Sequence, residues 1–178
     1  MIEIVSAQTG QQLDQFIQLA QEYVTWMIGE VQTHYSQLDL PSFIAAHDYD
    51  DLRRKYPGDH VPPAGCLRIA IDGEQVAGCI ALGKLSESIC EVRTLFVRPE
   101  FRGQGIGRLC VAHVLTEAQN IGYRQARLDT LGFMSDALHL YRSFGFRDIE
   151  PYGAIPDSLR PYIRFLELDL DGSIQTTH

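Results

Sequence analysis

Three closely spaced glycines near the middle of the chain, Gly103, Gly105 and Gly107, form the pattern with the clearest chemical meaning. They follow a strand-like segment that ends before Pro99, and they open a segment with helical spacing. The first N–H groups of a helix have no partner within the helix, and the helix dipole places about half a positive charge there. Glycines let an anion come close to such amides. The pattern therefore predicts a site that binds a phosphate group through the backbone.

Arginines surround this glycine turn, against a single acid, Glu100. The four arginines are Arg93, Arg98, Arg102 and Arg108. A P-loop is excluded because no Lys-Ser or Lys-Thr pair follows the glycines, and the G-x-G-x-G spacing differs from the G-x-G-x-x-G of dinucleotide sites. A tight turn without a ligand is the alternative, and the arginines and the helix start both disfavour it.

Two linked motifs extend the pattern beyond the glycine turn. The first is V-R-P at residues 97–99 followed by R-G-Q-G-I-G at residues 102–107. The second is A-L-H-L-Y-R-S-F-G-F at residues 137–146. Both motifs resemble signatures of the GNAT superfamily of N-acetyltransferases, in which a strand separates the two. The resemblance covers residues 89–148 closely.

The resemblance implies a three-layer α/β (α+β) fold, with a mixed, mostly antiparallel and splayed sheet flanked by helices, and acetyl-CoA as the cosubstrate. In the family the pantetheine arm pairs with a central strand, here at Leu95, Phe96 and Val97. The pyrophosphate lies on the backbone of the glycine turn, here Arg102, Gly103, Gln104, Gly105, Ile106, Gly107 and Arg108. Many relatives have Asn where this chain has Met134, so that contact to the cofactor arm is missing or is supplied by Ser135.

Glu91 is the candidate general base, which acetyl transfer needs because an amine is mostly protonated at neutral pH. It lies within an apolar run of the strand that leads to the glycine turn. Period-two alternation places Glu91 and Arg93 on one face and Cys90, Val92 and Thr94 on the other. A carboxylate is costly to bury without a purpose or a partner. An ion pair with Arg93 or with a neighbouring strand is the alternative role.

Tyr141 lies in the second motif, and the resemblance places it near the sulfur of the thioester, where it could protonate the departing thiolate. A tyrosine of ordinary pKa, about 10, carries its proton at neutral pH. A ring that only packs into the core is the alternative. A tetrahedral intermediate would also need an oxyanion donor, which the backbone N–H of Val97 or a neighbour could supply.

The sequence indicates the binding site of the acetyl acceptor less clearly than the cofactor site. The family builds it from the first two helices, the loop before the first hairpin and the C-terminal strands. The candidates here are Trp26, Tyr35, Tyr49, Asp59, His60 and the loop at residues 152–156. Core packing is the alternative for Trp26, and an exposed loop pair is the simpler interpretation of Asp59 and His60.

Three functions fit these residues. The favoured one is an enzyme that acetylates a primary amine of a small molecule by direct attack, because the proline-rich segments 57–63 and 151–161 would narrow the cleft. The acidic first third of the chain also favours a cationic acceptor. The alternatives are acetylation of a protein lysine or N-terminus, and a non-catalytic acyl-CoA sensor.

The composition of the chain bears on its binding partners, its location and its metal content. The 178 residues carry a net charge of −8, which argues against nucleic acid. No apolar run has membrane-spanning length and the N-terminus lacks signal-peptide features, so we expect no membrane association and a cytoplasmic location. The four cysteines include no C-x-x-C pair and the histidines are scattered, so we expect reduced thiols and no metal. Folds of this kind are often homodimers.

The periodicity predicts a single domain at residues 1–172 and a flexible tail at 173–178. The expected strands are 2–6, 67–71, 75–82, 89–97, 127–130 and 163–170. The expected helices are 8–32, 42–56, 105–120 and 135–144. Pro41 is expected to break the first helical pattern, and the last strand to lie at a sheet edge.

Overall fold

A computed structural model describes residues 1–170 of the chain, so the predicted tail at 173–178 lies outside the described residues. One seven-stranded sheet runs through the molecule in the order β1-β2-β3-β4-β5-β7-β6. The strands are β1 (Ile2–Ser6), β2 (Cys66–Asp72), β3 (Gln75–Lys84), β4 (Ile89–Val97), β5 (Gln125–Leu131), β6 (Arg147–Asp148) and β7 (Ile163–Asp169). The helices are α1 (Gly10–His34), α2 (Leu40–Ala46), α3 (Leu52–Lys55), α4 (Ile106–Ile121) and α5 (Ser135–Ser143), with short 3₁₀ turns at Pro99–Phe101 and Arg160–Tyr162.

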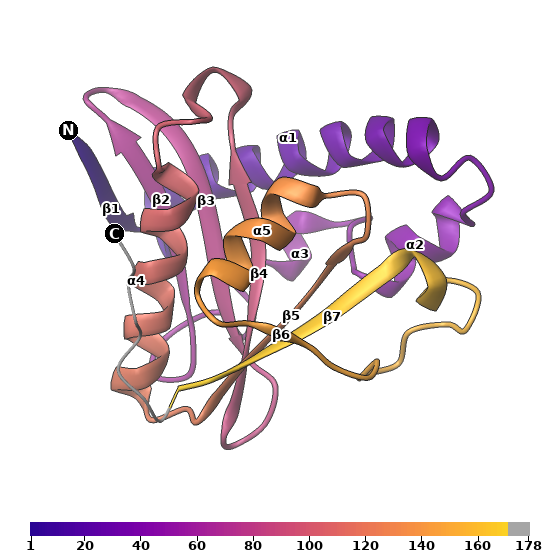
Figure 1. Cartoon of the computed structure of the whole chain (residues 1–178). Coiled ribbons are helices and arrows are strands. Elements are labelled where there is room, and N and C mark those ends of the chain that lie inside the picture. The colour runs from indigo at the N-terminus through magenta and orange to yellow at the C-terminus, as the bar shows by residue number, and fades with distance from the viewer. Residues whose placement is uncertain (171–178) are drawn as a thin grey trace.

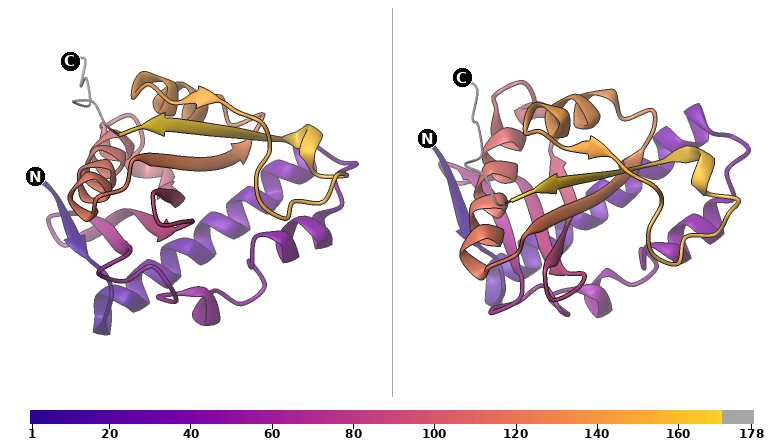
Figure 2. Two further views of the ribbon diagram at one scale, coloured as in Figure 1. Left: turned by 90° about the horizontal axis from the view of Figure 1, so that it is seen from below. Right: turned by 60° about the horizontal axis from the view of Figure 1, so that its bottom comes forward.

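Helices cover both faces of the sheet (Figures 1 and 2). On one face, α4 and α5 bury apolar side chains such as Val114 and Leu138 against the strands. On the other face, α1 and α3 bury Phe16, Leu19 and Leu52. Each helix turns one apolar stripe toward the sheet, and together these layers bury the core on both sides of it.

The central strands β4 and β5 separate part-way along their length. They pair in parallel only over residues 89–91 and 125–127. Beyond Glu91, β4 continues in antiparallel contact with β3 alone, and β5 pairs with β7 on its other side. The sheet is therefore splayed, and the gap opens next to residues 92–97.

A β-bulge in β4 changes which face its side chains point to. In the register with β3, Cys79 lies opposite Phe96 and Ala81 lies opposite Arg93, so two residues of β4 oppose one of β3. Thr94, at the bulge, has a left-handed φ of 51°. As a result Val92 packs toward α4 whereas Phe96 packs toward α1.

The bulge corrects the predicted face of Thr94. Simple alternation placed Thr94 with Cys90 and Val92, but its hydroxyl lies 2.6 Å from the hydroxyl of Tyr56, which belongs to the core on the α1 side. A period of two fails wherever an extra residue enters a strand.

The predicted helix 42–56 was wrong, because the segment forms two helices, α2 and α3. Pro41 lies in the first turn of α2 rather than ending a helix, which its fixed φ and missing N–H allow. Asp39 caps α2 by accepting from the Ser42 amide, and Asp51 caps α3 by accepting from the Arg54 amide. Each cap starts a separate helix, and Asp48 between them has a left-handed φ of 52°.

The prediction that the last strand is an edge strand was also wrong. β7 lies between β5 and the two-residue β6, which is too short to leave a periodic pattern. Its apparent polar alternation comes from Glu167, which is 6% exposed and pairs with Arg127 and Arg147 at 2.8 and 3.1 Å.

Candidate active site

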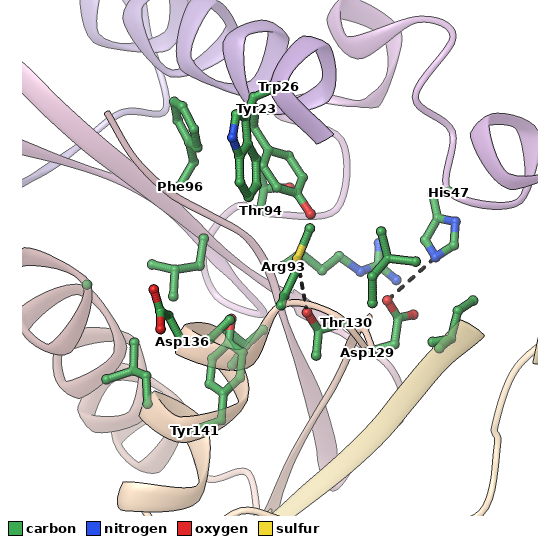
Figure 3. Close-up of a pocket in the computed structure, with 18 of the residues that line it drawn as sticks. Tyr23, Trp26, His47, Arg93, Thr94, Phe96, Asp129, Thr130, Asp136 and Tyr141 are labelled. Carbon is green, nitrogen blue, oxygen red and sulfur yellow. Dashed lines mark hydrogen bonds and ion pairs between the residues drawn. The ribbon is translucent and has the colours of Figure 1, made fainter. Parts of the chain in front are cut away.

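A cavity of about 670 Å³ opens where β4 and β5 separate. Of the residues named above for catalysis or cofactor binding, all but Gln104 line it. Figure 3 shows Tyr23, Trp26 and Phe96 on one side of this cavity and Tyr141 on the opposite side. Its volume lies within the usual range for small-molecule sites.

The glycine turn forms one end of the cavity. Gly103 and Gly105 have left-handed φ values of 76° and 80°, a conformation that other residues adopt only with strain. Gly105 caps α4, and the first helical bond runs from the Leu109 amide to the Gly105 carbonyl at 3.0 Å. Amides before that bond have no carbonyl partner within the helix. A Cβ built on Gly103 or Gly105 would meet no atom within 4 Å, so other parts of the chain do not pack against the turn at these positions. The turn therefore fits a diphosphate group.

The predicted basic surroundings of this turn are weaker than the arginine count suggests. Arg98 makes two 2.8 Å bonds to Glu22 on α1, and Arg93 pairs with Glu91, so carboxylates neutralise both. Arg102 stacks over the Trp26 ring at 4.8 Å. An anion at this turn would therefore be bound mainly by the backbone amides rather than by a cluster of four cations.

The inner edge of β4 forms a second wall. Leu95, Phe96 and Val97 line the cavity beyond the point where pairing with β5 ends. A strand edge without a neighbouring strand can pair with an extended ligand by backbone hydrogen bonds. The residues present fit an extended amide-bearing arm that reaches from the glycine turn toward Glu91.

Glu91 lies in the cavity wall and is only 6% exposed. Its Oε2 accepts from Arg93 Nε, and its Oε1 accepts from the Tyr152 hydroxyl at 2.7 Å. Glu91 and Arg93 share a face, as alternation predicted. Burial, with the charge of Glu91, raises the pKa of Tyr152 far above its usual value. Tyr152 therefore stays protonated and donates a hydrogen bond to Glu91. The carboxylate thus has an ion pair with Arg93 and contacts the cavity through the Tyr152 hydroxyl.

Tyr141 is 6% exposed and lines the cavity opposite Trp26 (Figure 3). Its ring meets Phe146 edge-on at 5.7 Å, so the ring does pack into the core. Its hydroxyl has no hydrogen-bond partner recorded among residues 1–170. Burial raises the pKa of Tyr141 well above its usual value, which keeps the hydroxyl protonated. Core packing and a proton-donor role are therefore compatible.

Residues 25–146 match the acetyltransferase (GNAT) family. The chain belongs to the GNAT family. An uncharacterized N-acetyltransferase of Schizosaccharomyces pombe is 34% identical over 153 residues, which is 85% of this chain and 86% of the relative. The uncharacterized N-acetyltransferase YjgM of Escherichia coli is 32% identical over 127 residues, 70% of this chain and 74% of the relative.

Solved acetyltransferase structures share the fold. A Bacillus subtilis acetyltransferase in complex with CoA aligns with a TM-score of 0.62 at 18% identity, over 95% of this chain and 99% of that one. A GNAT family acetyltransferase from Staphylococcus aureus aligns with a TM-score of 0.67 at 17% identity, over 96% and 100% of the two chains. These likenesses confirm the predicted three-layer GNAT fold.

This GNAT protein has a second charged pair in the cavity that sequence reasoning missed, formed by Asp129 on β5 and His47 after α2 (Figure 3). His47 Nε2 lies 3.5 Å from Asp129 Oδ1, and its Nδ1 lies 2.9 Å from the Phe43 carbonyl. Both neighbours only accept hydrogen bonds, so the ring favours its doubly protonated form. Burial alone lowers the pKa of His47, but the hydrogen bond and charge of Asp129 outweigh it and raise the pKa above 6.5.

One signal could have found Asp129. It is a carboxylate in the strand between the two motifs, although the polar Arg127 and Thr130 beside it make it less conspicuous than Glu91. No periodic signal marks His47, because it follows the short α2 helix and reaches the cavity only through tertiary packing.

The predicted acceptor residues divide into two groups. Trp26, Tyr49 and the segment 152–155 line the cavity. Tyr35 does not, and packs instead on Phe133 and Tyr162.

The remaining pair, Asp59 and His60, also lies outside the cavity lining. The interpretation of both as an exposed loop pair was wrong for His60, which is 4% exposed beneath Gly83 of β3. The glycine leaves room for the imidazole ring, a packing relation that the loop's own sequence does not reveal.

The Met134 side chain has no hydrogen-bond donor to offer a ligand, because a thioether can only accept. Its sulfur already accepts from the Thr130 hydroxyl at 3.4 Å. Ser135 is exposed at the start of α5 and lines the same cavity. Ser135 is therefore the better placed of the two for a polar contact.

Two features are absent from residues 1–170. Within that range no helix combines the length and apolar character that crossing a bilayer requires. The same residues contain no group of three or more His, Cys, Asp or Glu side chains arranged to hold a metal ion.

Proposed function

We propose that this protein transfers the acetyl group of acetyl-CoA to a primary amine of a small molecule. The observation that carries the proposal is the single cavity that joins the glycine turn at α4 to the buried pair Glu91 and Tyr141. A phosphate cradle and proton-transfer groups on one cavity are what acetyl transfer to an amine needs.

Acetyl-CoA supplies an acetyl group activated as a thioester. The amides of Gly103 to Gly107 bind its diphosphate, and the backbone of Leu95 to Val97 pairs with its amide-bearing arm. Ser135 makes the polar contact that Met134 cannot make.

Glu91 acts as the general base through Tyr152. The carboxylate is nearly buried and its Oε2 is held by Arg93, so an amine in the cavity reaches it best through the Tyr152 hydroxyl, 2.7 Å from Oε1. Tyr152 passes its proton to Glu91 and takes one from the amine. Arg93 positions Glu91 in this chain of transfers.

Tyr141 acts as the general acid. Its hydroxyl remains protonated at neutral pH and Tyr141 lines the cavity, so it can give a proton to the departing thiolate. In this mechanism the amine attacks the thioester carbonyl directly, and no residue of the protein carries the acetyl group in between.

A small acceptor is favoured by the walls of the cavity. Aromatic side chains from α1 and the α2–α3 segment close one side, and residues 152–155 close another. These walls leave less room for a peptide chain than an open groove would.

The test is a thiol-release assay with acetyl-CoA and a panel of amines that includes small molecules, lysine-containing peptides and peptides with free N-termini. We expect turnover with small amines and little with peptides. Preferred peptide turnover would favour a protein acetyltransferase, and tight acetyl-CoA binding without turnover of any amine would favour a sensor.

The proton relay predicts that Tyr152→Phe lowers kcat by about 10²-fold or more, since a general base is typically worth about 10²–10⁴ in rate. Glu91→Gln should lower kcat at least as much. Tyr162→Phe, a tyrosine outside the cavity lining, is the matched control and should keep full activity. A normal rate in Tyr152→Phe would exclude the relay.

A further inference from the structure

Lys55, the last residue of α3, brings an ammonium group to the cavity wall on the acceptor side. Its Nζ donates to the His47 carbonyl and lies 4.7 Å from the centre of the Tyr49 ring. The Tyr56 ring lies 5.6 Å from the same atom, and the His47 carbonyl takes one of the three N–H donors of the ammonium. Within residues 1–170 no carboxylate lies within 4.0 Å of Lys55 Nζ.

The other cations beside Lys55 already have carboxylate neighbours. Arg93 pairs with Glu91, and His47 Nε2 lies 3.5 Å from Asp129 Oδ1. Asp48 also lines the cavity and its charge favours the ammonium form of Lys55, but from beyond ion-pair distance. Lys55 is thus the cation on the acceptor side of the described cavity whose carboxylate partner is missing.

Leaving this ammonium without a carboxylate has an electrostatic cost. Burial, followed by repulsion from Arg93, lowers the pKa of Lys55 from 10.5 to about 8. Two cations that repel one another across one cavity would both be stabilised by an added anion. An incoming carboxylate would accept a further Lys55 N–H and offset this repulsion.

Asp129 provides the opposite charge on the facing strand. It is about a quarter exposed, lines the cavity, and has His47 as its recorded ion-pair partner at 3.5 Å (Figure 3). Aromatic rings of Tyr23 and Tyr49 stand beside the same space, and such faces attract an ammonium. The acceptor side therefore presents one cation and one anion with exposed contact positions.

Resting on the acetyltransferase function proposed above, we propose that the acceptor is an amino acid or a similar molecule that carries a carboxylate close to its amine. Lys55 binds the carboxylate, and Asp129 attracts the ammonium before it loses its proton to Tyr152. A zwitterion matches the two charges and adds no net charge to the cavity.

The test compares kcat/KM for a set of L-amino acids and for their carboxamides, which keep the amine and lose the negative charge. We expect the acids to be at least tenfold better substrates of the unaltered protein. Equal or better turnover of the carboxamides would overturn the proposal while leaving the acetyltransferase function intact. Absence of turnover with every amine would overturn both.

Lys55→Met, which keeps an unbranched apolar chain, should lower kcat/KM for the acids at least tenfold and leave the carboxamides unchanged. Lys84→Met is the control, because Lys84 lies at the end of β3, outside the cavity lining, and pairs with Glu87. An equal loss for acids and carboxamides in Lys55→Met would contradict a carboxylate contact. The comparison of substrates on the unaltered protein decides the question even where the variant folds poorly.

Discussion

At the scale of single residues, the most informative side chain is Glu91. A carboxylate in an apolar strand indicated either a base or an ion pair, and the structure contains the ion pair in a cavity wall, with Tyr152 as a link to the open space. The two roles are compatible, because one carboxylate oxygen accepts from Arg93 and the other accepts from the Tyr152 hydroxyl.

The role of Tyr141 is tested by Tyr141→Phe. We expect kcat to fall well over tenfold while the dissociation constant for acetyl-CoA changes little, because only the proton donor is removed. Stability should hardly change, since the hydroxyl has no hydrogen-bond partner recorded among residues 1–170 and the phenyl ring keeps its contact with Phe146. The measurements are steady-state kinetics, calorimetric binding and a thermal melt. An unchanged kcat would remove Tyr141 from the mechanism.

Residues that face a cavity only through tertiary packing could not be predicted. Glu91 and Tyr141 stood out because each lies in a motif or in an unusual local setting. Lys55 and His47 lie in a short, irregular segment whose path across the sheet depends on long-range contacts. Their types and spacing resemble those of any polar surface segment.

At the scale of elements, the bulge in β4 and the turn before α4 shape the site. The turn was predictable, because glycines at left-handed positions leave a clear sequence pattern. The bulge was not, because Thr94 carries no glycine-like signal at its φ of 51°. The splay of β4 from β5 followed from the family resemblance rather than from strand propensity.

The turn predicts that Gly105→Glu abolishes acetyl-CoA binding, because the side chain would place bulk and negative charge in front of the α4 amides. A left-handed φ also strains any non-glycine residue, by about 1 kcal/mol. Gly73→Glu is the matched control, since Gly73 is left-handed with equally open space but lies in the β2–β3 hairpin. Calorimetry should show no binding for the first variant and normal binding for the second. Normal affinity in Gly105→Glu would place the diphosphate elsewhere.

At the scale of the whole molecule, strand and helix order was largely predictable, since long periodic segments such as α1, β4 and α4 agree closely with their expected ranges. The misplaced parts were short or depended on partners far along the chain. Within the sheet, Glu167 of β7 forms ion pairs with Arg127 of β5 and Arg147 of β6. No local sequence pattern indicates these contacts between strands.

His60 makes the stability of the fold sensitive to acid. Its ring is buried against Gly83, its Nδ1 lies 3.1 Å from the Pro57 carbonyl, and its Nε2 has no partner among residues 1–170. Burial, with repulsion from Arg93, lowers the pKa of His60 to about 4. Between this value and 6.5 the unfolded chain binds a proton that the folded chain does not, so stability is full above pH 6.5 and falls as the pH drops toward 4.

Urea unfolding at pH 7.0 and about pH 4.5 tests this effect. His60 should account for about 2–3 kcal/mol of the loss in unfolding free energy between the two pH values. His60→Gln should shrink that loss by a similar amount, whereas His139→Gln at an exposed position should not. An equal loss in His60→Gln and the unaltered protein would show that His60 is not the acid-sensitive group.

The most direct measurement is a crystal structure of the protein grown with acetyl-CoA. We expect the diphosphate on the amides of residues 103–107 and the thioester in the gap between β4 and β5, within reach of Tyr141 and Tyr152. A nucleotide bound at another surface, with those amides contacted by protein groups instead, would contradict it.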